Sequence, residues 1–122
     1  MLTTLAILSA CCLGLGADTA VTPAENAPAA KMRVLVVTGG HAFDRPAFRD
    51  LFAAMPEYDV TFHTLKDESE IFEDISDWPY DVLVLYNMSQ KISEKRKKNF
   101  LALLDRGVGL VVLHHAIAAF ND

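Results

Sequence analysis

Apolar residues after position 30 fall in short runs separated by polar or glycine-containing turns. Three of these runs are rich in β-branched residues and contain almost no polar side chain: Met32–Thr38, Tyr80–Tyr86 and Val108–Leu113. Uninterrupted apolar strands are typical of a parallel sheet that helices cover, so we expect these three strands to be buried on both faces. A fourth run, Tyr58–Leu65, alternates apolar and polar residues and predicts a strand nearer the edge of the sheet.

Two helices are predicted between these strands. The first has apolar residues at the spacing of one helical face, namely Phe48, Leu51, Phe52 and Met55. Asp44 is a candidate cap at its start, and Pro46 suits its first turn. The second helix begins after Ser93 and ends at Gly107, and its apolar side consists of Phe100, Leu103 and Leu104.

The order of these elements predicts an α/β fold, a flavodoxin-like doubly wound parallel sheet with helices on both of its faces. Between the second and third strands, the acid-rich residues 67–77 are expected to be a solvated connection or a short helix. The basic residues Lys95–Lys98 are expected to form the exposed face of the second helix.

The last predicted strand is followed by nine residues and by no further helix. A buried strand needs cover on both faces, so we expect the domain over residues 31–122 to be incomplete at its C-terminus. The uncovered strand also predicts that residues 31–122 aggregate when they are alone.

The first thirty residues have the pattern of a targeting signal and spacer rather than of a folded domain. Leu2–Leu15 is apolar and uncharged, shorter than the roughly 20 residues that span a bilayer, and of the length found in export signals. Leu8-Ser9-Ala10-Cys11 looks like a bacterial lipobox, although no basic residue precedes the run. We therefore expect a signal peptide or lipoprotein signal over residues 1–17, a flexible spacer over 18–30, and an exported protein that is periplasmic or lipid-anchored.

Two alternatives stay open for this N-terminal segment. Export with simple cleavage near Gly16 competes with a lipid anchor at Cys11, and that anchor would be the only membrane attachment. A buried N-terminal helix is the other interpretation, and Gly14 and Gly16 would interrupt it early.

Charge and cysteine content exclude several classes of function. The formal net charge is −5, whereas a dedicated nucleic-acid-binding protein normally has a basic surface. Both cysteines, Cys11 and Cys12, lie in the N-terminal segment, so residues 31–122 hold none. An internal disulfide, a cysteine zinc site and a cysteine nucleophile are therefore excluded in the body of the chain.

The candidate functional residues lie directly after the carboxyl ends of the predicted strands. Gly39, Gly40, His41 and Asp44 come after the first strand, Asn87 comes after the third, and His114 and His115 come after the fourth. Ligands of such sheets bind outside the carboxyl ends of the strands, so we expect these residues to meet at one edge. Gly39, Gly40, His41 and Asn87 are the predicted substrate-binding residues. The remaining histidine, His63, lies within the edge strand and is expected to be structural.

His114, His115 and Asp44 are the predicted catalytic residues. A sharp turn after the last strand would present one imidazole of the His114–His115 pair to the pocket while its neighbour packs beneath, and such an imidazole transfers protons near neutral pH. His41 and Asp44 would act as a base held by its carboxylate or as a metal pair, and Asp44 would also serve simply as a helix cap. The cofactor is unknown. A metal site built from His41, His114 and Asp44 is a less favoured variant, since these spacings are unspecific.

Three blocks of the sequence resemble the ThuA-like (trehalose utilisation) family. They are Val36–Asp44, Tyr80–Val84 and Gly107–Ala116, and they occur in the order that this family has. The resemblance implies a class I glutamine amidotransferase-like fold and a pocket that includes His41, Asp44, His114 and His115. True amidotransferases carry their catalytic cysteine in the turn after the last of these strands. Here that turn reads His114-His115-Ala116, so a cysteine-dependent glutaminase is excluded.

The resemblance implies a small-molecule carbohydrate as the partner. We expect an exported protein that acts on a disaccharide or keto-sugar by histidine acid/base chemistry. The alternative is a non-catalytic sugar-binding or accessory module, or an inactive fragment, in which the same polar edge holds hydroxyl groups without a reaction.

Overall fold

A computed structural model describes residues 30–66, 68–88 and 90–120 of the chain, which form an α/β structure around a four-stranded parallel sheet. Its elements follow the chain as β1 (Met32–Gly39), α1 (Arg45–Ala53), β2 (Tyr58–Thr64), η1 (Glu70–Phe72), β3 (Val82–Asn87), α2 (Glu94–Asp105), β4 (Gly109–Val112) and η2 (His114–Ala118). The elements η1 and η2 are short 3-10 helices. The predicted signal over residues 1–17, with Cys11, lies outside the described residues.

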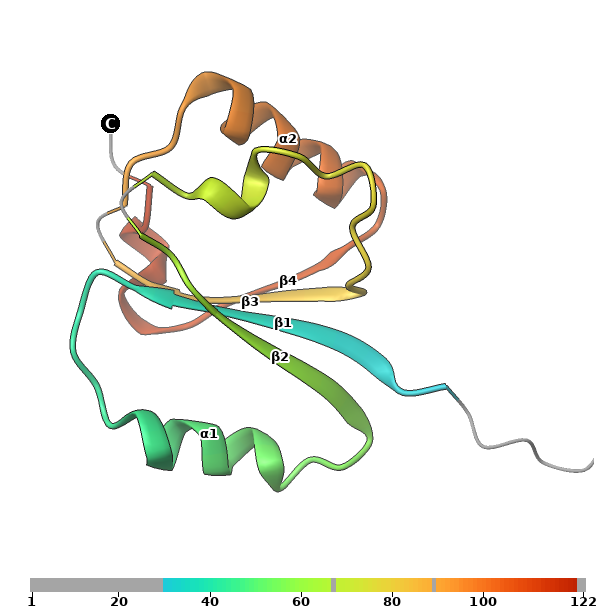
Figure 1. The fold of residues 1–122 in the computed structure, drawn as a ribbon, viewed down its shortest axis with the longest axis vertical. Coiled ribbons are helices and arrows are strands. Elements are labelled where there is room, and N and C mark those ends of the chain that lie inside the picture. Colours follow the sequence, from blue (N-terminus) through green and yellow to red (C-terminus); the bar gives the residue numbers. More distant parts are fainter. Residues whose placement is uncertain (1–29, 67, 89, 121–122) are drawn as a thin grey trace, which may run out of the picture.

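The strand order in the sheet is β2-β1-β3-β4, and every neighbouring pair is parallel. The chain moves from β1 to β2 on one side and then crosses to β3 on the other side, so the strand order reverses between β1 and β3. All four strands and both helices are present where the hydrophobic pattern predicts them. Figure 1 shows α1 on one face of the sheet and α2 with η1 on the other, which confirms the predicted arrangement of the helices.

The two faces of the sheet carry two separate apolar clusters, because successive residues of a strand point to opposite sides. On the α2 face, Leu35 and Val37 of β1 pack in one buried cluster with Phe72 of η1 and Leu103 of α2. On the α1 face, the smaller cluster contains the buried residues Val34, Val36 and Val84, with Phe48 and Phe52 of α1 packed against them. The expectation of burial on both faces is therefore confirmed for β1 and for the centre of β3.

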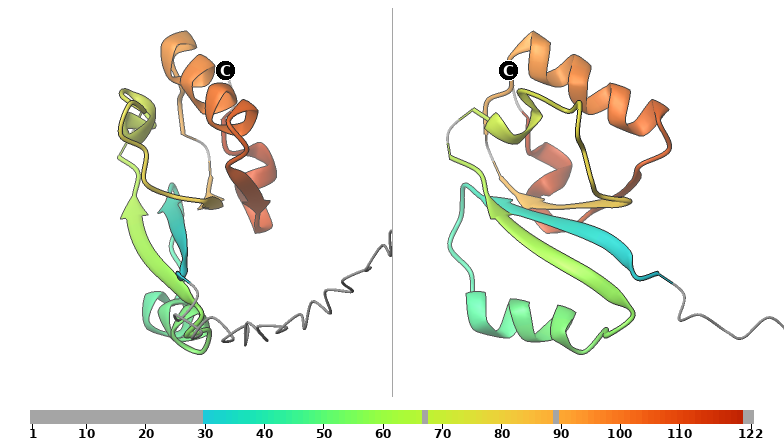
Figure 2. Two further views of the ribbon diagram at one scale, coloured as in Figure 1. Left: turned by 90° about the vertical axis from the view of Figure 1, so that its right-hand side faces the viewer. Right: turned by 45° about the vertical axis from the view of Figure 1, so that its right-hand side comes forward.

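The same expectation is wrong for β4. Leu110, Val111 and Val112 are 40%, 41% and 43% exposed. Among the described residues β4 lies at the end of the sheet beside β3, and α1 lies toward the opposite end, which leaves Val111 uncovered on the α1 face. An apolar groove of about 390 Å³ therefore remains beside α1, and Val111 and Leu113 line part of it. Figure 2 shows the sheet and both helices from two further sides.

The acidic connection contains one short helix, η1, as one of the two predictions has it, but its charges are not all solvated. Glu73 accepts a hydrogen bond of 2.7 Å from Nε of Arg96 and forms an ion pair with Lys95. Arg96 also donates to the backbone oxygen of Glu68 at 2.7 Å, and its side chain is 17% exposed. The acidic and basic runs that the sequence shows separately thus hold η1 against α2.

No helix among residues 30–66, 68–88 and 90–120 has the length and apolar character needed to cross a bilayer.

Candidate functional site

The predicted Gly39-Gly40 turn is present and requires glycine at its second position. Gly40 has φ of +78°, and a Cβ atom there would lie 1.6 Å from the backbone oxygen of Met88. Gly39 is also in the left-handed region, with φ of +145°, and its oxygen accepts a hydrogen bond of 3.0 Å from the Met88 backbone. The turn therefore brings the end of β1 directly against the residue that follows β3.

His41 follows this turn and lies beside the end of β3 and the start of η2. Its Nε2 lies 3.2 Å from the backbone oxygen of Tyr86 and its Nδ1 lies 3.3 Å from the oxygen of Ala42. The ring centroid of His41 is 4.9 Å from that of Tyr86, 6.1 Å from that of His114 and 5.8 Å from that of His115. The predicted meeting of His41 with His114 and His115 at one edge is thus present in the structure, with Tyr86 of β3 beside them.

His114 and His115 lie together on the surface. Their rings stack with centroids 3.7 Å apart and an interplanar angle of 27°, and both side chains are exposed. The expectation that one imidazole packs beneath the other residue is therefore wrong: neither is buried, because the turn directs both rings toward His41. Among the described residues, no hydrogen bond engages a ring nitrogen of either histidine, so both retain groups that can exchange protons with a ligand.

The backbone at His114 is in the left-handed region, with φ of +55°. This conformation costs a residue with a Cβ roughly 1–2 kcal/mol relative to the right-handed form. It occurs where β4 turns into η2, and Ala116 and Ala119 anchor the following residues in the buried cluster on the α2 face. Strain of this kind persists where the surrounding structure imposes it and is frequent at functional sites.

Asp44 acts as the helix cap and is not a partner of His41. Its Oδ1 accepts a hydrogen bond of 3.1 Å from the backbone N–H of Ala47, and the residue is exposed. Both ring nitrogens of His41 instead face the backbone oxygens of Ala42 and Tyr86. The interpretation of His41 as a base held by the Asp44 carboxylate is therefore wrong in this structure, because the capping interaction turns the carboxylate toward the helix.

Asn87 lies beneath the edge rather than on it. Its side chain is 0% exposed, and its Nδ2 donates a hydrogen bond of 3.1 Å to Oε1 of Gln90. Gln90 is buried as well, and its Nε2 donates to the backbone oxygen of Lys66 at 3.2 Å. The two amides therefore join the segments that follow β2 and β3, and the direct ligand contact predicted for Asn87 is not available in this structure.

His63 lies apart from the other three histidines. Its Nε2 is 3.5 Å from Oε1 of Glu70, a long contact across the connection between β2 and η1. Burial would raise the pKa of the Glu70 carboxyl, but the backbone N–H groups of Glu70 and Lys66 and the His63 ring outweigh it, so this pKa lies below its ordinary value. The contact is consistent with the structural role expected of His63.

No group of three or more histidine, cysteine, aspartate or glutamate side chains among the described residues is arranged to hold a metal ion. The metal hypothesis for His41, His114 and Asp44 therefore lacks its ligand set, since the carboxylate is at the helix cap.

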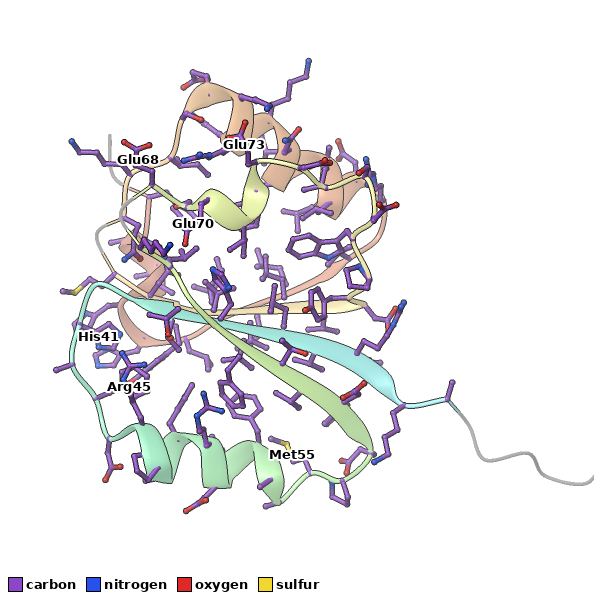
Figure 3. The ribbon with its side chains drawn as sticks, viewed as in Figure 1. His41, Arg45, Met55, Glu68, Glu70 and Glu73 are labelled. Carbon is purple, nitrogen blue, oxygen red and sulfur yellow. The ribbon has the colours of Figure 1, made fainter. Side chains whose placement is uncertain are left out.

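Two arginines of α1 were given no role in the sequence analysis. Arg45 lies with its Cζ 5.3 Å from the ring centroid of Phe43, and Arg49 lies with its Cζ 4.4 Å from that of Phe62. Figure 3 shows His41 and Arg45 at the same end of the molecule, where β1 leads into α1, and Met55 at the opposite end of α1. The signal that would have found them is their spacing of four residues, which places two guanidinium groups on one helical face.

No family model, curated protein or solved structure matches this chain.

Proposed function

We propose that this chain is an exported carbohydrate-related protein of the ThuA-like type, and that the edge formed by His41, His114 and His115 acts on a disaccharide or keto-sugar. The substrate class comes from the resemblance of the three sequence blocks. The strand order β2-β1-β3-β4 supports the finer fold assignment, a flavodoxin-like sheet of the class I glutamine amidotransferase type.

The observation that carries this proposal is the stacked His114–His115 pair at the strained turn after β4. Both imidazoles are exposed and their ring nitrogens are not engaged by other described residues, so either ring can take a proton from a sugar hydroxyl or return one. His41 has a different role, because the Tyr86 carbonyl oxygen and the Phe43 and Tyr86 rings fix its position. We assign proton transfer to His114 or His115 and positioning to His41.

The test is turnover of disaccharides and 3-ketodisaccharides by the full chain and by variants His114→Ala and His115→Ala. We expect at least one of them to lose about 100-fold or more in activity, the usual contribution of a positioned acid or base. His63→Ala is the matched control, since this histidine pairs with Glu70 away from the edge. Unchanged turnover in both edge variants would remove the assigned roles.

A non-catalytic sugar-binding module is the second candidate. The exposure of both stacked rings favours it, because an open aromatic surface can pack against a sugar without proton transfer. Saturable binding of a sugar without any product, lost in both variants, would support this candidate and exclude the enzyme.

The same turnover experiment, repeated with a chelator, tests whether the reaction depends on a metal ion. The absence of a ligand set among residues 30–66, 68–88 and 90–120 leads us to expect turnover that a chelator does not change. Stoichiometric metal in the purified chain together with loss of activity on chelation would contradict this.

Export and lipid anchoring at Cys11 belong to the same proposal. Expression of the chain and of its Cys11→Ser variant in a bacterial host tests them. Membrane association of the unmodified chain that disappears in the variant supports the anchor, whereas soluble periplasmic protein in both cases supports simple cleavage.

A further inference from the structure

Two guanidinium groups share one side of α1, and that of Arg45 adjoins the proposed sugar site through Phe43. Arg45 is the first residue of this helix, and Arg49 is one turn further along. Both residues line the same small depression of about 10 Å³, together with the side chains of Thr38, Thr64 and neighbouring phenylalanines. A space of this size holds about one water molecule, so any larger group would bind across its mouth.

The chemistry around this depression favours a negatively charged group. Arg45 donates a hydrogen bond of 3.4 Å from its terminal nitrogen to Oγ1 of Thr64, and each guanidinium is held beside a phenylalanine ring. None of the described carboxylates lies within ion-pair distance of either arginine. A guanidinium group presents planar, paired donors that suit a carboxylate or a phosphate.

The depression adjoins the histidine edge through one ring. Phe43 contacts the His41 ring, with centroids 5.5 Å apart, and it also carries the guanidinium of Arg45 at 5.3 Å. The imidazole and the guanidinium thus flank the same phenylalanine. A sugar held at His41 and its neighbours would therefore present a substituent to Arg45.

We propose that Arg45 and Arg49 form an oxyanion-binding subsite, and that the sugar handled at this edge carries a carboxylate or a phosphate. This inference deepens the proposed function and rests on it for the sugar, whereas the oxyanion site itself stands on the arginine geometry. Two arginines four residues apart on one helical face act on the same ligand group, since neighbours at this spacing lie close together.

The experiment measures binding to the full chain by calorimetry, with glucuronate, glucose 6-phosphate, glucose and inorganic phosphate as probes. We expect at least one acidic sugar to bind about tenfold tighter than glucose, and this preference to fall as salt is raised. Comparison of glucuronate with glucose 6-phosphate identifies whether the oxyanion is a carboxylate or a phosphate.

The variants are Arg45→Gln and Arg49→Gln, with Arg45→Lys as the conservative change. Each glutamine variant should remove most of the preference for the acidic sugar and leave the affinity for glucose unchanged. The lysine variant should keep part of it, because it retains the charge but not the planar pair of donors. Lys98→Gln, a loss of one positive charge on the exposed side of α2, is the matched control and should keep the full preference. Thermal melts show that each variant is folded.

The outcomes separate the two proposals. Equal binding of glucose and the acidic sugars, or a preference that survives in both glutamine variants, overturns the oxyanion subsite and leaves the sugar function standing. Arginine-dependent binding of inorganic phosphate without binding of either acidic sugar supports the oxyanion subsite and overturns the inference that the sugar carries the oxyanion. Binding of none of the four probes overturns the oxyanion subsite, and turnover of disaccharides and 3-ketodisaccharides tests the sugar function separately.

Discussion

Nε2 of His41 lies 3.2 Å from the backbone carbonyl oxygen of Tyr86, so a side chain that follows β1 is tied to the end of β3. The strand order reverses between these two strands, and ligands of open α/β sheets bind at such a point. A neutral imidazole has one N–H, so it donates either to Tyr86 or, through Nδ1, to Ala42. His41 is therefore a fixed part of the edge, and the exposed pair His114 and His115 is left for chemistry.

The left-handed backbone at His114 predicts an unusual order of stability among its variants. Glycine adopts a φ of +55° without strain and alanine does not, so His114→Gly should be more stable than His114→Ala by about 1 kcal/mol. Urea unfolding followed by circular dichroism measures the difference. At His115, which is outside the set of positive-φ residues, the order should be reversed, with glycine the less stable. Equal stability of the two His114 variants would show that the turn is unstrained.

The two glycine turns predict a graded response to a single methyl group. Gly107 has φ of +91° and open space around the added Cβ, so Gly107→Ala should cost the backbone strain alone, about 1 kcal/mol. Gly40→Ala adds a collision at 1.6 Å with the Met88 oxygen and should cost far more, enough to prevent folding of a marginally stable chain. Thermal melts of both variants test this. Similar melting temperatures would mean that the Gly40 turn shifts freely away from Met88.

Replacements at Asp44 distinguish a cap from a catalytic group. Serine caps helices as well as aspartate does but has no carboxylate, so Asp44→Ser should keep the free energy of unfolding, whereas Asp44→Ala should lose about 1 kcal/mol. Because the Asp44 carboxylate is bound to the Ala47 N–H, we also expect the serine variant to keep its activity on the sugar substrate. A stable serine variant without activity would restore Asp44 to the catalytic machinery.

The Arg33–Asp81 pair predicts a loss of stability in acid. The Arg33 guanidinium and backbone N–H lower the pKa of Asp81 from 3.8 to about 2. A carboxyl with a lowered folded-state pKa stabilises the fold fully above its unfolded pKa, and this stabilisation disappears as the pH falls through the folded value. Asp81→Asn should therefore melt below the unmodified chain at neutral pH, and the gap should close between about pH 4 and pH 2. A gap that stays constant across that range would contradict the pairing.

Exposed apolar side chains of β4 and of the following η2 predict self-association. Ile117 is 88% exposed and Val112 is 43% exposed, so residues 31–122 should aggregate, and replacement of both by lysine should reduce light scattering. Leu101→Lys, on the exposed side of α2, is the control and should have little effect. A cooperative and monomeric thermal transition of residues 31–122 without these changes would contradict the expectation.

The local pattern of the sequence was sufficient to predict the helices and strands and the edge at which the strands end. Three uninterrupted β-branched runs and one alternating run predicted the four strands, and Asp44 and Ser93 cap the two helices that the pattern predicts. Parallel strands bring their carboxyl ends to one edge, so the meeting of His41 with His114 and His115 also followed from the element order.

The tertiary structure alone decided which of these side chains are available. Asn87 and Asp44 occur in the right segments, but the first is buried against Gln90 and the second is turned to its own helix. The exposure of β4, the stacking of His114 on His115 and the pairing of the acidic run with α2 likewise depend on partners distant in the chain. A sequence pattern specifies which face of an element a residue occupies. What covers that face, and which neighbour takes each hydrogen bond, is set by packing between elements.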